Sequence, residues 1–406
     1  MRSVDEHLST ILEVVGPLPP FEQPLLEALG LPIAEDAVSP IDLPGFDNSA
    51  MDGYACYHRD VSTATRDDPV RLPVVGESAA GQSTAYALSP GQAVKIMTGA
   101  PLPTGADCVI PVEWTDRGRA SVTITQAPRL GEHVRPRGED VRAGDRLLDR
   151  GTLIGPREAM ILAATGHGRI RARPRPRVVV LSTGSELREP GSALGFDSIY
   201  DCNSFSLAAA TRQADAIAYR VGIISDDPRE LGDALSDQLV RADVVVTSGG
   251  VSKGDYDVVK EVLSRLGTVD FVEVAMQPGK PQGFGTIGED STPIFTLPGN
   301  PVSSYVSFEV FVLPAIRRMM GKVPYRRPLV RAECTADISS PRGRRQFVRA
   351  HFEVTEHGAQ VTPVGGYGSH LIGSLAKANS LIVVDESVAS VEQGSVVDVL
   401  ALDRNF

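Results

Sequence analysis

One segment of the chain combines a glycine-rich loop with acidic side chains. It runs from Val244 to Asp257: an apolar, β-branched run ends in Thr-Ser-Gly-Gly-Val-Ser, and the carboxylates of Asp255 and Asp257 follow. Backbone N–H groups in such a loop, at the start of a following helix, bind phosphate or another oxyanion. Acidic side chains repel that ligand unless a divalent cation bridges the two or a carboxylate acts as a base. The segment therefore indicates chemistry on an anionic ligand, with magnesium as the expected cation.

Three further strand-like runs end in comparable polar loops. These are Ser182-Thr-Gly-Ser-Glu186, Ser225-Asp-Asp227 and Leu297-Pro-Gly-Asn-Pro301. A glycine after one strand is often only a turn, but four such loops at one sheet edge would combine anion donors with carboxylates. The candidate donors are Gly249, Gly250 and Ser252, and the candidate carboxylates are Glu186, Asp226, Asp227, Asp255 and Asp257. A helix N-cap before a proline is an alternative role for Asp227.

Polar turns elsewhere add further candidates. Lys280 lies in the stiff turn Pro278-Gly-Lys-Pro281, where its ammonium group suits an oxyanion, although a solvated loop lysine has the same pattern. The segments 48–54 and 95–101, which contain Asp52 and Thr98, are dense in polar residues and glycine. Ordinary turns explain part of this pattern, so residue types alone leave the function of these two segments open.

Alternating strands and helices must position these loops. Between residues 178 and 320, β-branched runs alternate with helical patterns, such as the stripe of Leu231, Leu235 and Leu239. Repeated βα units of this length predict a mostly parallel sheet between two helical layers, with ligands at the carboxyl ends of the strands. This rule places all four polar loops on one edge of the sheet.

The flanking regions have different patterns. Residues 1–45 are expected to form helical pieces broken by prolines, including a short helix over residues 21–30. Residues 48–145 contain short apolar runs between Gly, Pro and Asp turns, which predicts a small all-β domain. After residue 324 the pattern predicts a small sandwich or open barrel. Five arginines between residues 169 and 177 fit a connector better than an anion-binding arm.

Composition excludes several classes of protein. The 406 residues exceed one ordinary core, since domains usually hold ~100–200 residues. A formal net charge of −11 argues against a nucleic-acid partner, because binding to the phosphate backbone needs Lys and Arg. The four cysteines are far apart, so reduced thiols and a cytoplasmic location are expected. We expect neither a signal peptide nor a membrane-spanning helix.

Taken together, the motifs resemble those of the molybdopterin molybdenumtransferase family, MoeA, which includes the gephyrin E domain. They occur in the family's order from about residue 40 to residue 380, so the resemblance covers nearly the whole chain. The matching segments are Asn48–Tyr54, Ile96–Pro101, Arg137–Asp140, Ser182–Leu187, Ser248–Ser252, Pro278–Pro281 and Leu297–Ser304.

The resemblance implies a multidomain α/β plus β fold and a homodimer with shared active sites. The expected parts are a segmented helical, elongated domain, an inserted small β domain, a central three-layer α/β domain and a C-terminal β-barrel-like domain. The central domain would resemble pterin adenylyltransferases and bind molybdopterin. The expected bounds are, in that order, 1–45 with 146–176, 46–145, 177–323 and 324–406.

The resemblance also implies a reaction. Molybdate and adenylylated molybdopterin would be the substrates, and a divalent cation, Mg²⁺, would assist the release of AMP as the molybdenum cofactor forms. Further partners would be the pterin adenylyltransferase and the apoproteins of molybdoenzymes. Neither nucleic acid nor a membrane would be a partner.

Family roles carry over to matching positions only. The catalytic positions are Asp52, Thr98, Glu186 and Asp257, and the metal-binding positions are Glu186, Asp226 and Asp257. The substrate-binding positions are Ser182, Thr183, Gly184, Ser248, Gly249, Gly250, Ser252, Lys280, Pro298, Pro301 and Ser369. Asp52 and Thr98 would face the cleft of the partner subunit. Residues 248–252 would hold phosphate, Lys280 would bind molybdate or the pterin phosphate, and Ser369 would close the site.

Two positions depart from the family pattern. Glu273 and Gln277 stand where relatives commonly have basic residues, and a carboxylate there repels an oxyanion, most strongly in a dry site. Two other functions share parts of this fold: the preceding pterin adenylyltransferase, which resembles the α/β region alone, and a non-catalytic scaffold like the gephyrin E domain. The acids Asp52, Glu186 and Asp257 favour catalysis over the scaffold.

Overall fold

The computed structural model describes residues 1–81, 86–225, 227–249, 256–356, 358–403 and 406. Its contacts divide the chain into two compact units. The first unit holds Met1–Gln23, Gly30–Ala34 and Arg171–Phe406, and the second holds Pro24–Leu29 and Glu35–Ile170. No described helix is long and apolar enough to cross a membrane.

A mixed sheet forms the centre of the first unit. Strands β15, β12, β16 and β20 are parallel neighbours in that order, and β19 and β17 continue the sheet in antiparallel pairing. The bounds are Arg177–Thr183 (β12), Ile217–Ile224 (β15), Val244–Ser248 (β16), Gly267–Glu273 (β17), Pro281–Ile287 (β19) and Thr292–Leu297 (β20). The valines at 178–180 and 244–246 are fully buried, as expected for strands that are covered on both faces.

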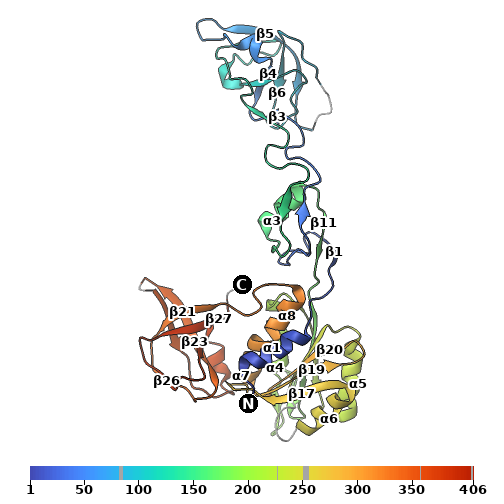
Figure 1. Cartoon of the computed structure of the whole chain (residues 1–406), viewed down its shortest axis with the longest axis vertical. Helices are drawn as coiled ribbons and strands as arrows, with labels where there is room; N and C mark the ends of the chain where they lie inside the picture. The colour runs from blue at the N-terminus through green and yellow to red at the C-terminus, as the bar shows by residue number, and fades with distance from the viewer. Residues whose placement is uncertain (82–85, 226, 250–255, 357, 404–405) are drawn as a thin grey trace. The chain divides into compact units, whose positions relative to one another are not determined.

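Helices cover both faces of this sheet and complete three layers (Figure 1). The helices are α4 (Asn203–Gln213), α5 (Pro228–Leu239), α6 (Tyr256–Leu266), α7 (Pro301–Ser307) and α8 (Leu313–Met320). One face packs α5 and α6 against Val179 and Leu181, and α4 and α7 lie on the other. A π-helical segment, η2 (Phe308–Val312), joins α7 to α8. The predicted three-layer α/β domain is confirmed.

The C-terminal strands form a closed barrel. β23, β24, β21, β27 and β25 pair in that order, and β25 pairs back with β23. The bounds are Leu329–Cys334 (β21), Arg345–Thr355 (β23), Gly358–Pro363 (β24), Ser380–Val384 (β25) and Val396–Ala401 (β27). The two-residue strand β18 (Met276–Gln277) joins the same sheet beside β23. The predicted barrel-like domain is therefore confirmed, and the barrel is closed.

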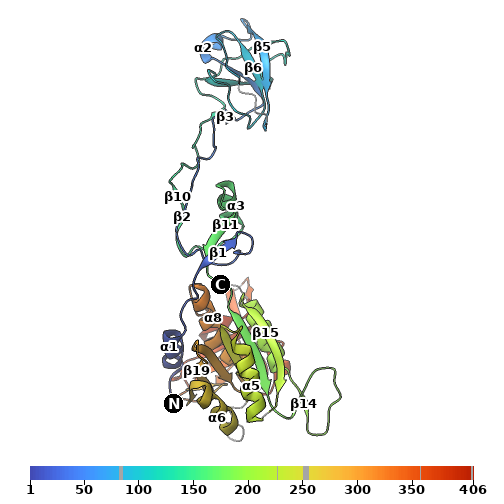
Figure 2. The same ribbon diagram turned by 90° about the vertical axis from the view of Figure 1, so that its right-hand side faces the viewer.

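Short elements complete the first unit. β13 (Leu187–Arg188) and β14 (Ile199–Tyr200) form a ladder in a loop that leaves the sheet (Figure 2). The others are β22 (Ile338–Ser339), β26 (Ser390–Val391) and α9 (Ile372–Leu375).

The N-terminal residues contribute a capped helix to the first unit. Helix α1 (Val4–Val14) begins with a capping box, in which Ser3 Oγ accepts from the N–H of Glu6 and Glu6 Oε2 accepts from the N–H of Ser3. The expected helix over 21–30 is wrong: Phe21–Pro24 is strand β1, and turns follow it. Pro24 interrupts this segment, and a proline removes a helical hydrogen bond.

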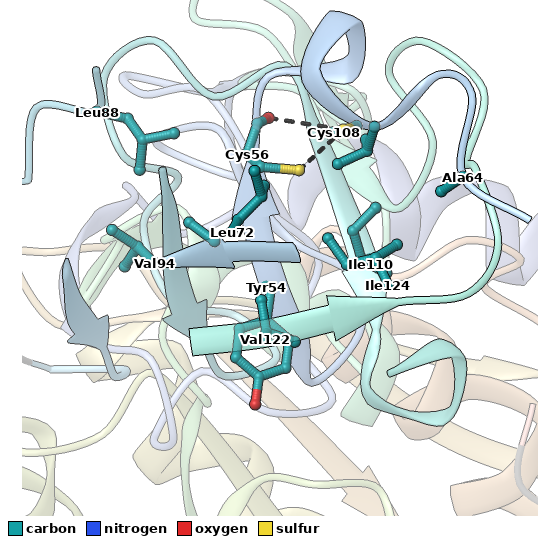
Figure 3. Close-up of a cluster of buried hydrophobic side chains, with 12 residues drawn as sticks. Tyr54, Cys56, Ala64, Leu72, Leu88, Val94, Cys108, Ile110, Val122 and Ile124 are labelled. Carbon is teal, nitrogen blue, oxygen red and sulfur yellow. Dashed lines mark hydrogen bonds between the residues drawn. The ribbon is translucent and has the colours of Figure 1, made fainter. Parts of the chain in front are cut away.

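The second unit contains the predicted small β domain. Its sheet has the order β7-β4-β6-β5-β8. The bounds are Gly53–Cys56 (β4), Val70–Ser78 (β5), Ala93–Ile96 (β6), Cys108–Pro111 (β7) and Ser121–Ile124 (β8). In its buried cluster, Cys56 and Cys108 lie opposite each other with Sγ atoms 3.8 Å apart, and both are free thiols (Figure 3).

Paired short strands and small helices make up the rest of the second unit. They are β2 (Ala37–Val38), β10 (Arg146–Leu148), β3 (Asn48–Ser49), β9 (Val134–Arg135), α2 (His58–Val61), η1 (Val112–Trp114) and α3 (Pro156–Ala164). α3 has the expected proline in its first turn. The strand β11 (Arg169–Ala172) spans the point at which the chain returns to the first unit.

His7 makes the stability of the first unit depend on pH. Its ring is 2% exposed, lies edge-on to Phe311 with the centroids 4.8 Å apart, and burial lowers the pKa of His7 from 6.5 to about 4. The neutral form is therefore favoured in the folded state, and unfolding takes up a proton below pH 6.5. A shift of this size corresponds to about 3 kcal/mol.

We expect the free energy of unfolding to fall as the pH decreases from 6.5 to about 4. His7→Gln should remove most of the slope between pH 6.5 and about 5, where carboxylates scarcely titrate, measured by denaturant unfolding at a series of pH values. His351→Gln, at an exposed position of β23, is the matched control and should leave the slope in place. Equal slopes for wild type and His7→Gln would contradict the assignment.

Candidate active site

Three strand ends of the first unit lie level with one another. Ser182, one residue before the end of β12, is in register with Ser248 at the end of β16, and Ser248 is in register with Leu297 at the end of β20. The prediction that the loops after these strands share one edge of the sheet is confirmed. The loops open on a cleft of about 560 Å³. The predicted site residues that line it are Thr183, Glu186, Ser248, Gly249, Pro298 and Pro301.

Two of these loops touch through their backbones. Gly249 has φ +101°, and a Cβ atom there would lie 2.4 Å from the carbonyl oxygen of Thr183. Only glycine fits this conformation and this contact. The buried Oγ1 of Thr183 has no hydrogen-bond partner among the described residues, so it can bond to a ligand.

Glu186 brings a carboxylate to the cleft. The preceding Gly184 has φ +151°, and a Cβ atom there would lie 2.6 Å from Glu186 Oε2. The side chain of Glu186 therefore folds back over a position that must stay free of side-chain atoms. Glu186 is exposed, so its carboxylate is accessible from the cleft.

Asp201 is a buried acid at the cleft that sequence reasoning missed. It is 1% exposed and accepts hydrogen bonds from Ser182 Oγ at 3.0 Å, the N–H of Ser204 at 3.1 Å and Ser204 Oγ. Arg220 lies 3.5 Å from its carboxylate. A buried charge needs partners of this kind. Asp201 thus holds the side chain of the predicted residue Ser182 through a buried hydrogen bond.

Asn203, also missed, ties three loops together. Its Nδ2 donates to Ser248 Oγ at 2.8 Å and to the carbonyl oxygen of Gly299 at 2.7 Å. It is the first residue of α4, so the positive end of that helix also points to the cleft. An acid and an amide at the start of a helix are the sequence signal that could have found Asp201 and Asn203.

The barrel supplies one wall of the cleft. Ser369 accepts a hydrogen bond from the N–H of Val302 through its carbonyl oxygen at 3.1 Å, whereas His370 and Ile372 line the cleft. Arg349, which is 4% exposed, donates to the carbonyl oxygens of Gly366 and Gly368 and so holds this loop. The substrate role of Ser369 stays a prediction. Sequence reasoning missed His370 and Arg349.

Lys280 lies next to the cleft residue Pro281. Its Nζ is 2.9 Å from Glu273 Oε1, and this pair is partly exposed. The lysine holds the pKa of Glu273 below its ordinary value, so the acid stays ionised.

Asp52 and Thr98 form a hydrogen-bonded pair in the second unit. Asp52 precedes β4 and Thr98 follows β6, and these strands are antiparallel neighbours. Asp52 Oδ1 accepts from the N–H of Thr98 at 2.7 Å and from Thr98 Oγ1 at 2.8 Å. These bonds, first that from the backbone, lower the pKa of Asp52. The pair therefore presents a carboxylate that stays ionised in mild acid.

Some predicted residues are beyond what the structure describes. Asp226, Gly250 and Ser252 lie outside the described residues, as does the side chain of Asp257, the second residue of α6. Asp227 caps α5 by accepting from the N–H of Arg229 and of Glu230, so the alternative role as an N-cap is confirmed.

Comparisons with known proteins cover nearly the entire chain. The MoeA N-terminal region (domain I and II) matches residues 2–166, a probable molybdopterin binding domain matches 179–318, and the MoeA C-terminal region (domain IV) matches 331–402. Molybdopterin molybdenumtransferase 2 of Mycobacterium tuberculosis is 46% identical over 406 residues, which cover 98% of this chain and 99% of that protein. The chain belongs to the MoeA family.

Further MoeA relatives agree over the full length. Molybdopterin molybdenumtransferase of Haemophilus influenzae is 35% identical and covers 98% of each chain. Two solved structures of MoeA proteins from Pyrococcus horikoshii, at 32% and 28% identity, cover 99% of this chain and 99% and 100% of their own chains. Their TM-scores are 0.85 and 0.76. The MoeA fold therefore extends over the whole chain.

Thr98→Val tests the source of the low pKa of Asp52. This substitution removes the hydroxyl donor and keeps the backbone donor, so we expect the pKa of Asp52 to rise part of the way to its ordinary value of 3.8. The measurement is an NMR titration of aspartate carboxyl carbons. Thr98→Ser retains a hydroxyl and should leave the pKa of Asp52 unchanged. An unchanged pKa in Thr98→Val would refute the role of the hydroxyl.

Proposed function

We propose that this chain transfers molybdenum to adenylylated molybdopterin, with metal-dependent release of AMP. Molybdenum insertion in molybdenum cofactor biosynthesis is the activity of its full-length relatives, and the identity of up to 46% carries this conclusion. It is an enzyme of the molybdenum-transferring class. The regions on both sides of the α/β part argue against a pterin adenylyltransferase, since these regions match MoeA models in family order.

The cleft of the first unit is the proposed site of the adenylylated pterin. Its volume of about 560 Å³ lies in the usual range of small-molecule sites. The Thr183 hydroxyl, the Ser248 hydroxyl and the start of α4 offer positive or donor groups to a phosphate. Gly184 and Gly249 leave room for close approach, and Pro298 and Pro301 shape the adjoining wall. Gly250 and Ser252 would add backbone and hydroxyl donors.

The described donors suit a divalent cation. Glu186 supplies a carboxylate and Thr183 supplies a hydroxyl oxygen that has no other partner among the described residues. Mg²⁺ prefers oxygen ligands of this kind. We propose that Glu186, Asp226 and Asp257 hold the cation. Among the described residues, no three His, Cys, Asp or Glu side chains lie together as metal ligands. Asp226 and the side chain of Asp257 lie outside the described residues.

The proposed reaction cleaves a phosphoanhydride bond and needs negative charge neutralised on its oxygens. A bound cation would supply part of this neutralisation. The chain's own groups prepare the cleft: Asn203 holds the Ser248 hydroxyl, which lines the cleft, and Asp201 accepts the Ser182 hydroxyl proton in a hydrogen bond that supports the end of β12. Lys280 would bind the incoming molybdate or the pterin phosphate, and Ser369 would close the site from the barrel. Each of these groups is held by a hydrogen bond or ion pair before the ligand binds.

A second copy of the chain is the proposed source of Asp52 and Thr98. In this homodimer, the partner's Asp52 would present its ionised carboxylate to the cleft, where the low pKa keeps it charged. The family resemblance supports this arrangement. The reducing compartment that the cysteine spacing indicates, and with it a cytoplasmic location, stays a prediction; the four cysteines are free thiols.

Asp257→Ala tests the metal-binding role. We expect AMP release from adenylylated molybdopterin, with magnesium and molybdate, to fall by at least about 100-fold, because the cation that neutralises charge in the transition state loses a charged ligand. Asp233→Ala, at an exposed position of α5, removes the same charge and should retain activity. Circular dichroism and thermal unfolding check the fold. Undiminished AMP release by Asp257→Ala would refute the assignment.

A further inference from the structure

The turn that carries Lys280 is anchored at both ends. It begins after β18, whose Met276 and Gln277 are in register with Arg345 and Gln346 of the barrel strand β23. It ends at Pro281, where β19 enters the central sheet. Because each end belongs to a different sheet, the turn is held at the junction of the barrel and the α/β part.

The middle of the turn is fixed as well. Gly279 has φ +102°, and a Cβ atom there would lie 2.9 Å from Ser307 Oγ. Gln282 Nε2 donates to the carbonyl oxygen of Gly279 and to Ser307 Oγ, both at 2.6 Å. The carbonyl oxygen of Lys280 accepts from the N–H of Val274 at 2.7 Å. The backbone of Lys280 is therefore rigidly placed, and only its side chain is free to choose a partner.

The same backbone contacts place Glu273 beside Lys280. Glu273 is the last residue of β17 and is in register with Pro281 of β19. Its carboxylate lies 2.9 Å from the ammonium group, and the two side chains are 62% and 37% exposed. Every residue of the turn Gln277–Pro281 is described, and Lys280 is its only cationic side chain. The β17–β19 register therefore places the acid Glu273 beside this one cation. Arg344 lies close enough to Glu273 to lower its pKa as well.

We infer that Glu273 competes with the oxyanion for Lys280 and so lowers the affinity of this chain for the oxyanion that the lysine binds. The inference rests on the proposed function, which gives Lys280 a role with molybdate or the pterin phosphate. An exposed ion pair is weak, so an incoming anion can displace Glu273 from the ammonium group. The displaced carboxylate stays nearby on the fixed strand end and repels the bound anion.

The repulsion depends on the charge of the ligand. Coulomb energy is proportional to the product of the two charges, so a dianion such as molybdate is penalised about twice as much in free energy as a monoanion such as perrhenate. The two ions have similar tetrahedral shapes. A role of Glu273 that was merely structural would affect both ions equally. Comparing them therefore isolates the electrostatic effect.

The test measures binding of molybdate and of perrhenate to full-length Glu273→Gln by isothermal titration calorimetry. We expect the Kd for molybdate to fall by about three- to tenfold and the Kd for perrhenate to fall by a smaller factor, because displacing Glu273 from Lys280 costs the same for either ion and only the repulsion grows with ligand charge. Added salt should reduce both gains. Glu289→Gln, at the exposed turn beyond the other end of β19, makes the same charge change and should alter neither Kd.

A double substitution shows whether Lys280 mediates the effect. In a Lys280→Gln background, Glu273→Gln should give a smaller gain for both ions, because the competition for the ammonium group is lost and only the direct repulsion remains. The inference is overturned if Glu273→Gln leaves the Kd for molybdate unchanged, if both ions gain equally, or if the gain is undiminished without Lys280. AMP release by wild type is measured separately. Its absence would overturn the proposed function, whereas AMP release together with an unchanged Kd would overturn only the role of Glu273.

Discussion

The parallel register of β12, β16 and β20 is the constraint on which the cleft depends. Ser182, Ser248 and Leu297 lie level with one another at the ends of β16 and β20 and one residue before the end of β12, and the three loops that follow must therefore share a narrow space. The backbone contact between Gly249 and Thr183 is a direct result, and it leaves no room for a side chain. A shift of one of these strands by one residue would turn the side chain at its own end to the opposite face of the sheet. The strand register of the sheet therefore determines where the site residues lie, and the loops only add to it.

A chain of net charge −11 handles an anionic ligand by local arrangement. Asp201, a buried acid near the cleft, accepts hydrogen bonds from Ser182 and Ser204. The carboxylate of Glu186 instead lies beside Gly184, where a cation can bind to it. Neutral donors such as Asn203 and Thr183 provide directional contacts without adding charge. Lys280 supplies a full positive charge, which Glu273 partly offsets. The balance of these groups sets how strongly an anion is held.

The sequence predicted those parts of the fold whose causes are local. The buried valine runs, the Asp227-Pro228 cap and the proline at the start of α3 each act within a few residues, and the structure has them. The helix expected over 21–30 failed because this segment pairs instead with β11, far away in the chain. Asn203 was missed for a similar reason: its partners lie 45 and 96 residues away. Residue types showed that Glu273 was unusual, but only the β17–β19 register showed which side chain it meets.

The strand β18 has a consequence for how this architecture can be rearranged. Its two residues lie in the middle of the chain, yet they hydrogen-bond with the sheet of the C-terminal barrel. An α/β part copied into another protein without the barrel would carry an unsatisfied strand at this point, and the barrel alone would have one side of the start of β23 unpaired, because β25 covers only the other side. The α/β part and the barrel are therefore not independent domains that could be exchanged one at a time. Recombination at this junction would need to replace both together, or rebuild the loop between β17 and β19.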